Sequence, residues 1–496
     1  MKRSAGVLLS VTSLPSKYGI GCFSQEAYDF VDWLAKAGQT YWQILPLGAT
    51  SYGASSDSPY QAFSAFAGNP YFISLDALIE EGVLTQEEVD AVDFGSDPAD
   101  VDYTALHENR FKLLRRAYER SDISRNPEYQ KFIRENHWWL NDYALFMAVH
   151  EFFGGVIWTE WPQDIRLRWG YSMDYYRREL YFDIEFHMYM QFQFDKQWKK
   201  LKAYANSRHI QIVGDIPIYP SPDGADVWSH PELFQLDANC RPTAVAGCPP
   251  DAFTADGQLW GNPLYDWVKM ANTDFAWWVD RLAAAAKMFD AVRLDHFRGF
   301  ESYWAVPAGD KTAVGGSWQK GPGEAYIRAI QTALPDLEFI AEDLGYVTPE
   351  VRRLQELSGY PGMKVLQFAF DSRESADYLP HTYPVNSVCY TGTHDNLTLA
   401  QWLQEADPQD IALAKAYLGL NEEEGPVWGM IRGGMGSVSR LCVIQMQDYL
   451  ELDGSARMNF PGTLSSDNWT WRAGKDMISS SLAERILQIT RRYGRA

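Results

Sequence analysis

Short runs of apolar residues recur along the chain and alternate with stretches whose apolar positions repeat at helical spacing. The first run, 6–11, is followed by a segment in which Ala27, Phe30 and Leu34 share one helical face, and the run 42–45 comes next. A strand, a helix and a second strand in this order predict a parallel pair of strands joined by a right-handed crossover. The start of the chain therefore predicts the repeating unit of an α/β protein.

The same alternation continues until eight strands are predicted. These apolar runs are 6–11, 42–45, 210–213, 291–294, 339–341, 363–366, 388–390 and 442–444. The helical patterns that precede the later runs are 193–204, 275–287, 324–334 and a segment that opens at Thr348-Pro349. Eight strands that alternate with helices favour a closed (β/α)8 TIM barrel over an open sheet. We expect one catalytic barrel spanning residues 1–496.

Two intervals are much longer than the roughly 30 residues of one strand–helix–strand unit. Residues 75–205 lie between the second and third predicted strands and carry mainly helical patterns, so they predict a helical insertion subdomain. Residues 219–274 are rich in proline and show little regular period. Such a segment is stiff but irregular, as suits an element that covers a site.

Composition narrows the classes of function. The chain has 44 Lys and Arg against 65 Asp and Glu, a net charge of −21, which argues against nucleic-acid and anionic-membrane partners. Its 19 Trp, 28 Tyr and 25 Phe are more than packing alone requires. Their flat faces and polar tips suit hydroxylated ligands.

The sequence also predicts a cytoplasmic protein. No apolar stretch approaches the roughly 20 residues of a membrane span. The apolar run near the N-terminus breaks at Ser10, before it reaches the length of a secretory signal. The five cysteines are odd in number and form no CxxC pair, which favours a reducing compartment.

Acidic residues stand where four of the predicted strands end. They are Asp215, Asp295, Glu342 and Asp395. In a (β/α)8 barrel the carboxyl ends of the strands form the rim on which active sites are built. One such residue is as readily a helix cap or a surface ion pair, but four on strand ends favour a catalytic site.

Two of these carboxyls have surroundings that predict different roles. Arg293 and Asp295 are two residues apart on a strand and face the same way, so we expect the guanidinium to lower the pKa of Asp295 and keep it ionised as a nucleophile. Glu342 follows the apolar run 339–341, where desolvation raises the pKa of a carboxyl and suits it to act as an acid. Retaining glycoside chemistry uses such a pair, with the two carboxyls about 5–5.5 Å apart. Asp395 and His394 are placed to bind adjacent sugar hydroxyls.

Motifs throughout the chain carry a family resemblance. They are Leu14-Pro15 with 19–21, Ser58-Pro59-Tyr60-Gln61 with 64–70, Gly214-Asp215-Ile216-Pro217-Ile218, Pro249-Pro250-Asp251 with 257–263, 293–299, Glu342-Asp343-Leu344-Gly345, Thr393-His394-Asp395-Asn396, 459–461 and 468–472. Together they resemble the 4-α-glucanotransferases of glycoside hydrolase family 77, the amylomaltases or disproportionating enzymes. The resemblance spans almost the whole chain in the order of the family.

The resemblance implies a barrel of the α-amylase clan that lacks a C-terminal β-sandwich domain. It implies Asp295 as nucleophile, Glu342 as general acid/base and Asp395 as transition-state stabiliser. It also implies that Tyr60 stacks under the donor sugar, that Arg293 orients the nucleophile, and that Asp215 and His394 bind hydroxyls. Residues 219–274 would cover the acceptor side, with Asp251, Gln258 and Trp260 as members of this cover. No cofactor or metal is implied.

The expected activity is transfer of a 1,4-α-glucan segment to the 4-hydroxyl of glucose or of another glucan, with malto-oligosaccharides as donor and acceptor. An α-glucan hydrolase of the amylase type uses the same three acids and remains the alternative enzyme. A non-catalytic glucan-binding barrel is disfavoured because Asp295, Glu342 and Asp395 are all present. A metal site at His394-Asp395 is disfavoured because the other histidines show no ligand spacing.

Overall fold

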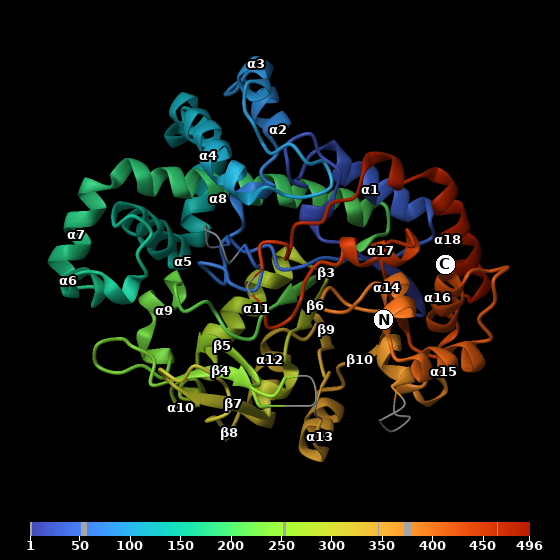
Figure 1. Ribbon diagram of the computed structural model, residues 1–496. Coiled ribbons are helices and arrows are strands. Elements are labelled where there is room, and N and C mark those ends of the chain that lie inside the picture. Colours follow the sequence, from blue (N-terminus) through green and yellow to red (C-terminus); the bar gives the residue numbers. More distant parts are fainter. Residues whose placement is uncertain (1, 51–56, 251–253, 346, 372–377, 464) are drawn as a thin grey trace.

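A closed barrel of eight parallel strands forms the centre of the protein (Figure 1). The structure is a computed structural model that describes residues 2–50, 57–250, 254–345, 347–371, 378–463 and 465–496. The barrel strands are β1 (Ser4–Leu8), β2 (Tyr41–Gln43), β3 (Gln211–Ile216), β6 (Ala291–Leu294), β9 (Glu338–Ala341), β10 (Gly362–Val365), β11 (Ser387–Tyr390) and β12 (Leu441–Gln445). Each lies on one of the eight predicted runs, and the predicted (β/α)8 class is confirmed.

The strands follow one another around the barrel in the order β1-β2-β3-β6-β9-β10-β11-β12, and β12 closes on β1. All residues of β1 and β12 are buried, as expected for parallel strands covered on both faces. Gly214 in β3 is required by packing, because a Cβ there would lie 2.2 Å from the ring of Phe289. The glycine lets this ring pack directly on the strand beside Asp215.

Helices cover the outside of the barrel. They are α1 (Gln25–Lys36), α11 (Ala276–Met288), α12 (Gly323–Ala333), α13 (Pro349–Ser358), α14 (Leu399–Glu405), α15 (Pro408–Leu418), α16 (Pro426–Gly436), α17 (Met446–Tyr449) and α18 (Ser480–Arg492). Helix α13 begins as its sequence predicts, with Thr348 as N-cap accepting from the Val351 N–H and proline at the first helical position.

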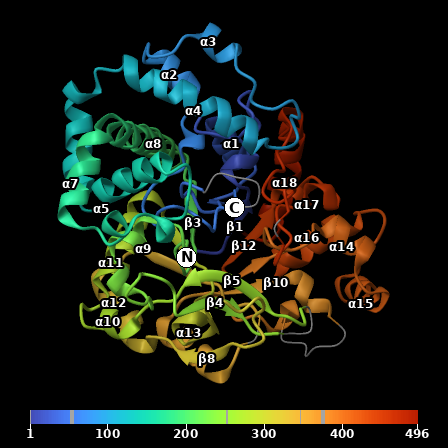
Figure 2. The same cartoon turned by 60° about the vertical axis from the view of Figure 1, so that its left-hand side comes forward.

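A group of helices lies between β2 and β3 in the sequence and extends to one side of the barrel (Figures 1 and 2). Its members are α2 (Leu75–Glu80), α3 (Gln86–Asp90), α4 (Tyr103–Arg120), α5 (Pro127–Phe152), α6 (Gln163–Arg166), α7 (Gly170–Glu179) and α8 (Tyr181–Ser207). The long helices α5 and α8 pack against each other. Aromatic contacts such as Tyr129–Phe192 and Phe132–Phe192 join them. Much of the high aromatic content therefore serves to pack these helices.

A second, four-stranded antiparallel sheet stands beside the barrel. Its strands are β4 (Ala244–Cys248), β5 (Gln258–Pro263), β7 (Ser302–Pro307) and β8 (Ser317–Lys320), in the order β5-β4-β7-β8. The short helices α9 (Ala225–Ser229) and α10 (Trp267–Ala271) flank β4 and β5 in sequence. Residues 219–274 are thus not wholly irregular. Sequence periodicity missed β4 and β5, because β4 lies between β5 and β7 in the sheet and β7 is distant along the chain.

No helix in the described part of the chain is long and apolar enough to cross a membrane.

Candidate active site

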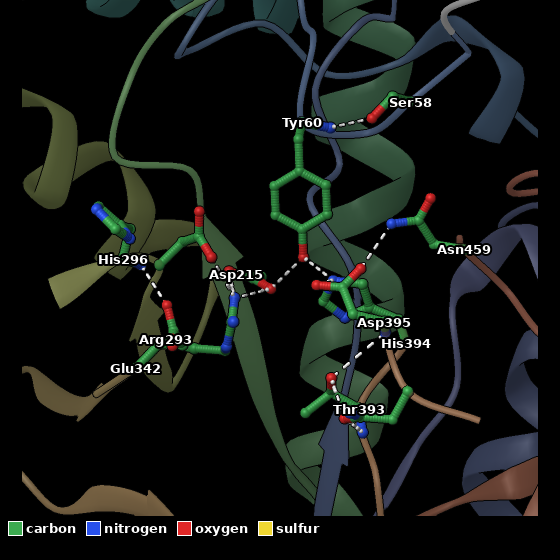
Figure 3. Close-up of polar contacts among 12 residues, drawn as sticks. Ser58, Tyr60, Asp215, Arg293, His296, Glu342, Thr393, His394, Asp395 and Asn459 are labelled. Atoms are coloured by element: carbon green, nitrogen blue, oxygen red, sulfur yellow. Dashed lines mark hydrogen bonds and ion pairs between the residues drawn. The ribbon is translucent and has the colours of Figure 1, made fainter. Parts of the chain in front are cut away.

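The carboxyl ends of four barrel strands bring the predicted acids together (Figure 3). Asp215 lies near the end of β3, Asp295 and Glu342 directly follow β6 and β9, and Asp395 lies in the segment after β11. A cleft of about 2800 Å³ opens above them. Its lining includes Tyr60, Gln258, Trp260, Arg293, Asp295, Glu342, His394 and Asp395. Asp251 lies outside the described residues.

Arg293 is the electrostatic centre of the site. It stands opposite Asp215 in the register of β3 and β6, and its Nη1 donates to both carboxylate oxygens of Asp215 at 2.7 Å. The same nitrogen donates to Asp295 Oδ1 at 3.1 Å. Arg293 is only 4% exposed, so two carboxylates compensate its buried charge. The orientation of Arg293 beside Asp295 is therefore fixed by Asp215 on β3.

The surroundings of Asp295 contradict one expectation. Burial raises the pKa of Asp295 to about 8, and the negative charges of Asp215, Glu342 and Asp395 act in the same direction. The Arg293 guanidinium lowers this pKa as the sequence predicts, but it does not outweigh the desolvation. The net shift is upward because burial outweighs the guanidinium, and the charge of Asp215, a partner that sequence spacing along β6 does not show, adds to it.

Glu342 is held by two backbone donors. Its Oε2 accepts from the His296 N–H at 2.7 Å and its Oε1 from the Leu344 N–H at 2.9 Å. His296 has a φ of 47°, a left-handed conformation that is unusual for a residue other than glycine and that occurs here next to Asp295. Burial raises the pKa of Glu342, as predicted, although the two N–H donors oppose the shift.

Tyr60 joins Asp215 to His394. Its hydroxyl donates to Asp215 Oδ2 at 2.7 Å and lies 2.9 Å from His394 Nε2. Because the hydroxyl proton is given to the carboxylate, Nε2 of His394 carries a proton and donates to the Tyr60 oxygen. Burial lowers the pKa of His394, which keeps the imidazole neutral. Figure 3 shows the three side chains in this order.

Asp215 is held between Arg293 and Tyr60. Its side chain is fully buried, and both oxygens are occupied by Arg293 and Tyr60. Asp215 therefore orients these two residues. The sequence predicted its place in the site but not this role, because the ring of Tyr60 arrives from a segment 155 residues away.

Asp395 has partners that sequence reasoning missed. Asn459 Nδ2 donates to Asp395 Oδ1 at 2.6 Å, and Arg457 donates to the backbone oxygen of Asp395 at 2.7 Å. His394 Nε2 lies 3.5 Å from Asp395 Oδ2. Trp469 packs at 5.8 Å from the rings of both Tyr60 and His394. The only sequence signal for Asn459 and Trp469 was their membership of the C-terminal motifs.

Gln258 and Trp260 reach the cleft from β5. Trp260 Nε1 donates to Gln258 Oε1 at 3.1 Å, and the indole meets the ring of His296 edge-on at 4.9 Å. Trp260 is thus part of a strand and not of an irregular loop. The backbone N–H of the same His296 donates to Glu342 Oε2, so His296 contacts both Trp260 and Glu342.

The chain matches known proteins over its whole length. The family described as 4-alpha-glucanotransferase matches residues 9–476. A 4-alpha-glucanotransferase of Streptococcus pneumoniae is 49% identical over 100% of this chain and 98% of its own, and one of Clostridium butyricum is 47% identical over 98% and 100%. The solved amylomaltase of Streptococcus agalactiae in complex with acarbose superposes with a TM-score of 0.96 at 40% identity and covers 100% of both chains.

Proposed function

This chain belongs to the 4-alpha-glucanotransferase family and is a 4-alpha-glucanotransferase; from this premise we propose that Asp295, Glu342 and Asp395 carry the transfer as a retaining double displacement. The observation that carries the proposal is the pairing across β6 and β9. Glu342 N–H donates to the Leu294 oxygen and His296 N–H donates to Glu342 Oε2, so the two strand ends are joined on both sides of Asp295.

The first displacement breaks the glycosidic bond of the donor. Protonated Glu342 gives its proton to the leaving oxygen while Asp295, which reacts in its ionised form, attacks the anomeric carbon from the other face, which leaves a glycosyl ester on Asp295. The raised pKa of Glu342 keeps the proton available for this step. In the second displacement the Glu342 carboxylate takes the proton of the acceptor's 4-hydroxyl, whose oxygen attacks the anomeric carbon and frees Asp295.

The remaining residues bind the donor sugar. The ring of Tyr60 lines the cleft and is fixed by Asp215 and His394, so it offers a rigid face on which a sugar stacks. Neutral His394 and Asp395 stand side by side and are suited to bind adjacent hydroxyls. Arg293 orients Asp295 and stabilises its ionised form.

The second sheet covers the acceptor side in this proposal. Transfer competes with hydrolysis, and it prevails when acceptor binding positions the 4-hydroxyl and water is excluded. Gln258 and Trp260 line the cleft from β5, within segment 219–274, which together with the helical segment 75–205 completes one catalytic unit around the barrel. The expected partners are malto-oligosaccharide donors and acceptors.

Incubation with maltotriose tests the activity. We expect glucose together with a ladder of longer glucans, because the bound glycosyl group is passed to a second maltotriose. Glucose and maltose without longer products would instead identify a hydrolase of the amylase type. The products are separated by chromatography.

The Asp295→Asn variant tests the residue assignment. It removes the nucleophile and almost no volume, so we expect a folded protein that neither transfers nor hydrolyses. The exposed Asp336→Asn serves as the matched control and should keep full activity. Substantial turnover by purified Asp295→Asn would overturn the assignment of Asp295.

We further propose a cytoplasmic location. A reducing compartment keeps the buried thiols of Cys389 and Cys442, which face each other on β11 and β12, from oxidation. Cell fractionation of the native host checks this proposal. Recovery of the activity outside the cytoplasm would contradict it.

A further inference from the structure

The segment 391–399, between β11 and α14, carries both His394 and Asp395, and a single buried carboxyl joins its two ends. That carboxyl belongs to Asp448 in α17, directly after β12. Thr391 Oγ1 donates to Asp448 Oδ2 at 2.6 Å, and the Leu399 N–H donates to Asp448 Oδ1 at 2.7 Å. We propose that Asp448 is a positioning residue for the transfer reaction, which acts by fixing the segment that carries His394 and Asp395.

Hydrogen bonds within the segment hold Thr393, Asp395 and Asn396 together. Asn396 Oδ1 accepts from the N–H and the hydroxyl of Thr393 at 2.8 and 2.9 Å, and Thr393 Oγ1 accepts from the Asp395 N–H at 3.3 Å. These bonds hold Asp395 within the segment but do not locate it on the barrel. Contacts from outside the segment locate it: Arg457 and Asn459 hold Asp395 in the middle of the segment, and Asp448 holds its two ends.

Asp448 supplies those end contacts from a rigid support. β11 and β12 are paired in the barrel, with Tyr390 opposite Val443, so α17 lies beside the end of β11. Asp448, Thr391 and Leu399 have no solvent exposure. Asp448 does not line the cleft, so it acts on the reaction only through the residues it holds.

Both oxygens of Asp448 accept hydrogen bonds, and these bonds offset part of the free-energy cost of burying the carboxyl. Burial raises the pKa of Asp448 to about 7. An amide has the shape of the protonated carboxyl and can still accept from Leu399, while its NH₂ group donates to the Thr391 hydroxyl. The positioning role should therefore survive Asp448→Asn and be lost in Asp448→Ala.

The inference rests on the proposed roles of His394 and Asp395, and the test separates the two. In maltotriose disproportionation we expect Asp448→Ala to lower kcat about 10- to 100-fold, because small displacements of catalytic groups have effects of this size. In a separate assay with glucose added as the acceptor, the KM for glucose should stay within about twofold, since the proposed acceptor side is lined from β5. Asp448→Asn should recover most of kcat.

A second glycosyl donor shows whether the loss of kcat depends on proton donation by Glu342. α-Maltotriosyl fluoride needs no proton for departure of fluoride, so its turnover does not depend on Glu342 as acid. We expect the loss in Asp448→Ala to persist with this donor, measured as fluoride release. Full recovery with the fluoride would place the defect at Glu342 and overturn the inference.

Further variants test whether a general loss of stability explains the loss of kcat. Asp290→Ala removes a carboxylate that accepts from the Ile212 N–H and from Asn206 at the opposite end of the barrel, and it should leave kcat unchanged. Thr391→Val removes only the hydroxyl that Asp448 binds, with Thr391→Ser as its control. It should lower kcat in the same direction as Asp448→Ala, and it decides the question if Asp448→Ala does not fold.

Asp395→Asn is measured in the same assay. An active Asp395→Asn would contradict the proposed function. An inactive Asp395→Asn together with wild-type kcat in Asp448→Ala and Thr391→Val would contradict the inference alone. Equal losses in Asp448→Asn and Asp448→Ala would also overturn it.

Discussion

At the scale of single residues, the site opposes the ionisation of Asp295, the proposed nucleophile. Burial and the charges of Asp215, Glu342 and Asp395 disfavour its charged form, and Arg293 favours it. A positively charged oxocarbenium-like sugar relieves this imbalance when it forms in the cleft. The folded protein without substrate therefore stores an unfavourable interaction that the transition state removes.

This interaction predicts a pH-dependent stability difference. In the unfolded chain the pKa of an aspartate is about 3.9, and in the fold that of Asp295 is raised to about 8. The unfolded state then binds fewer protons between these values, so this residue makes the protein less stable as pH rises from 4 to 8. Asp295→Asn should thus be more stable than the wild type by about 1 kcal/mol at pH 8, and by less at pH 5.

Urea denaturation at the two pH values measures the difference. Asp336→Asn, which changes an exposed carboxyl, should follow the wild type at both. A stability gain in Asp295→Asn that is the same at pH 5 and pH 8 would show that the charge of Asp295 is not its source.

At the scale of elements, strand β5 of the second sheet contacts the segment that follows barrel strand β6. Trp260 on β5 contacts the ring of His296, whose backbone holds Glu342. The sequence singled out Trp260 through its motif. It could not show that the residue lies in a sheet, because β4 pairs with both β5 and the distant β7.

Trp260→Ala should shift the balance from transfer towards hydrolysis. The change removes a flat apolar face beside the acceptor position, and an aromatic contact of this kind contributes about 1 kcal/mol. We expect the ratio of hydrolysis to transfer on maltotriose to rise about five- to tenfold, with Trp260→Phe in between. Reducing-end release compared with free glucose gives the ratio, and an unchanged ratio in Trp260→Ala would place the acceptor elsewhere.

At the scale of the whole molecule, a residue near the C-terminus holds together the two strands at which the barrel closes. Arg495 is 1% exposed and donates to the backbone oxygens of Ser4, Met435 and Ser437 at 2.8–3.0 Å. It also reaches the oxygen of Arg440 at 3.4 Å. Ser4 begins β1 and Arg440 precedes β12, so this guanidinium ties together the first and last strands at the point where the barrel closes.

Arg495→Ala should lower the free energy of unfolding by about 3 kcal/mol, because it removes the hydrogen bonds that a buried guanidinium donates to several backbone oxygens. Its kcat at moderate temperature should not change, since the site lies at the other end of the strands. Arg492→Ala, at an exposed position on α18, is the control. Chemical denaturation and kcat measured on the same preparations check both statements, and a stability equal to that of Arg492→Ala would contradict the role of Arg495.

The sequence by itself determined the eight strands, most of their helices and the placement of four acids on strand ends, because apolar periodicity and helix caps act over a few residues. Tertiary structure alone decided the raised pKa of Asp295, the burial of Asp215, the second sheet and the contacts of Asn459. Each of these depends on desolvation or on partners that are distant along the chain. Spacing within one strand shows that Arg293 faces Asp295, but only the fold shows that Arg293 is shared with Asp215.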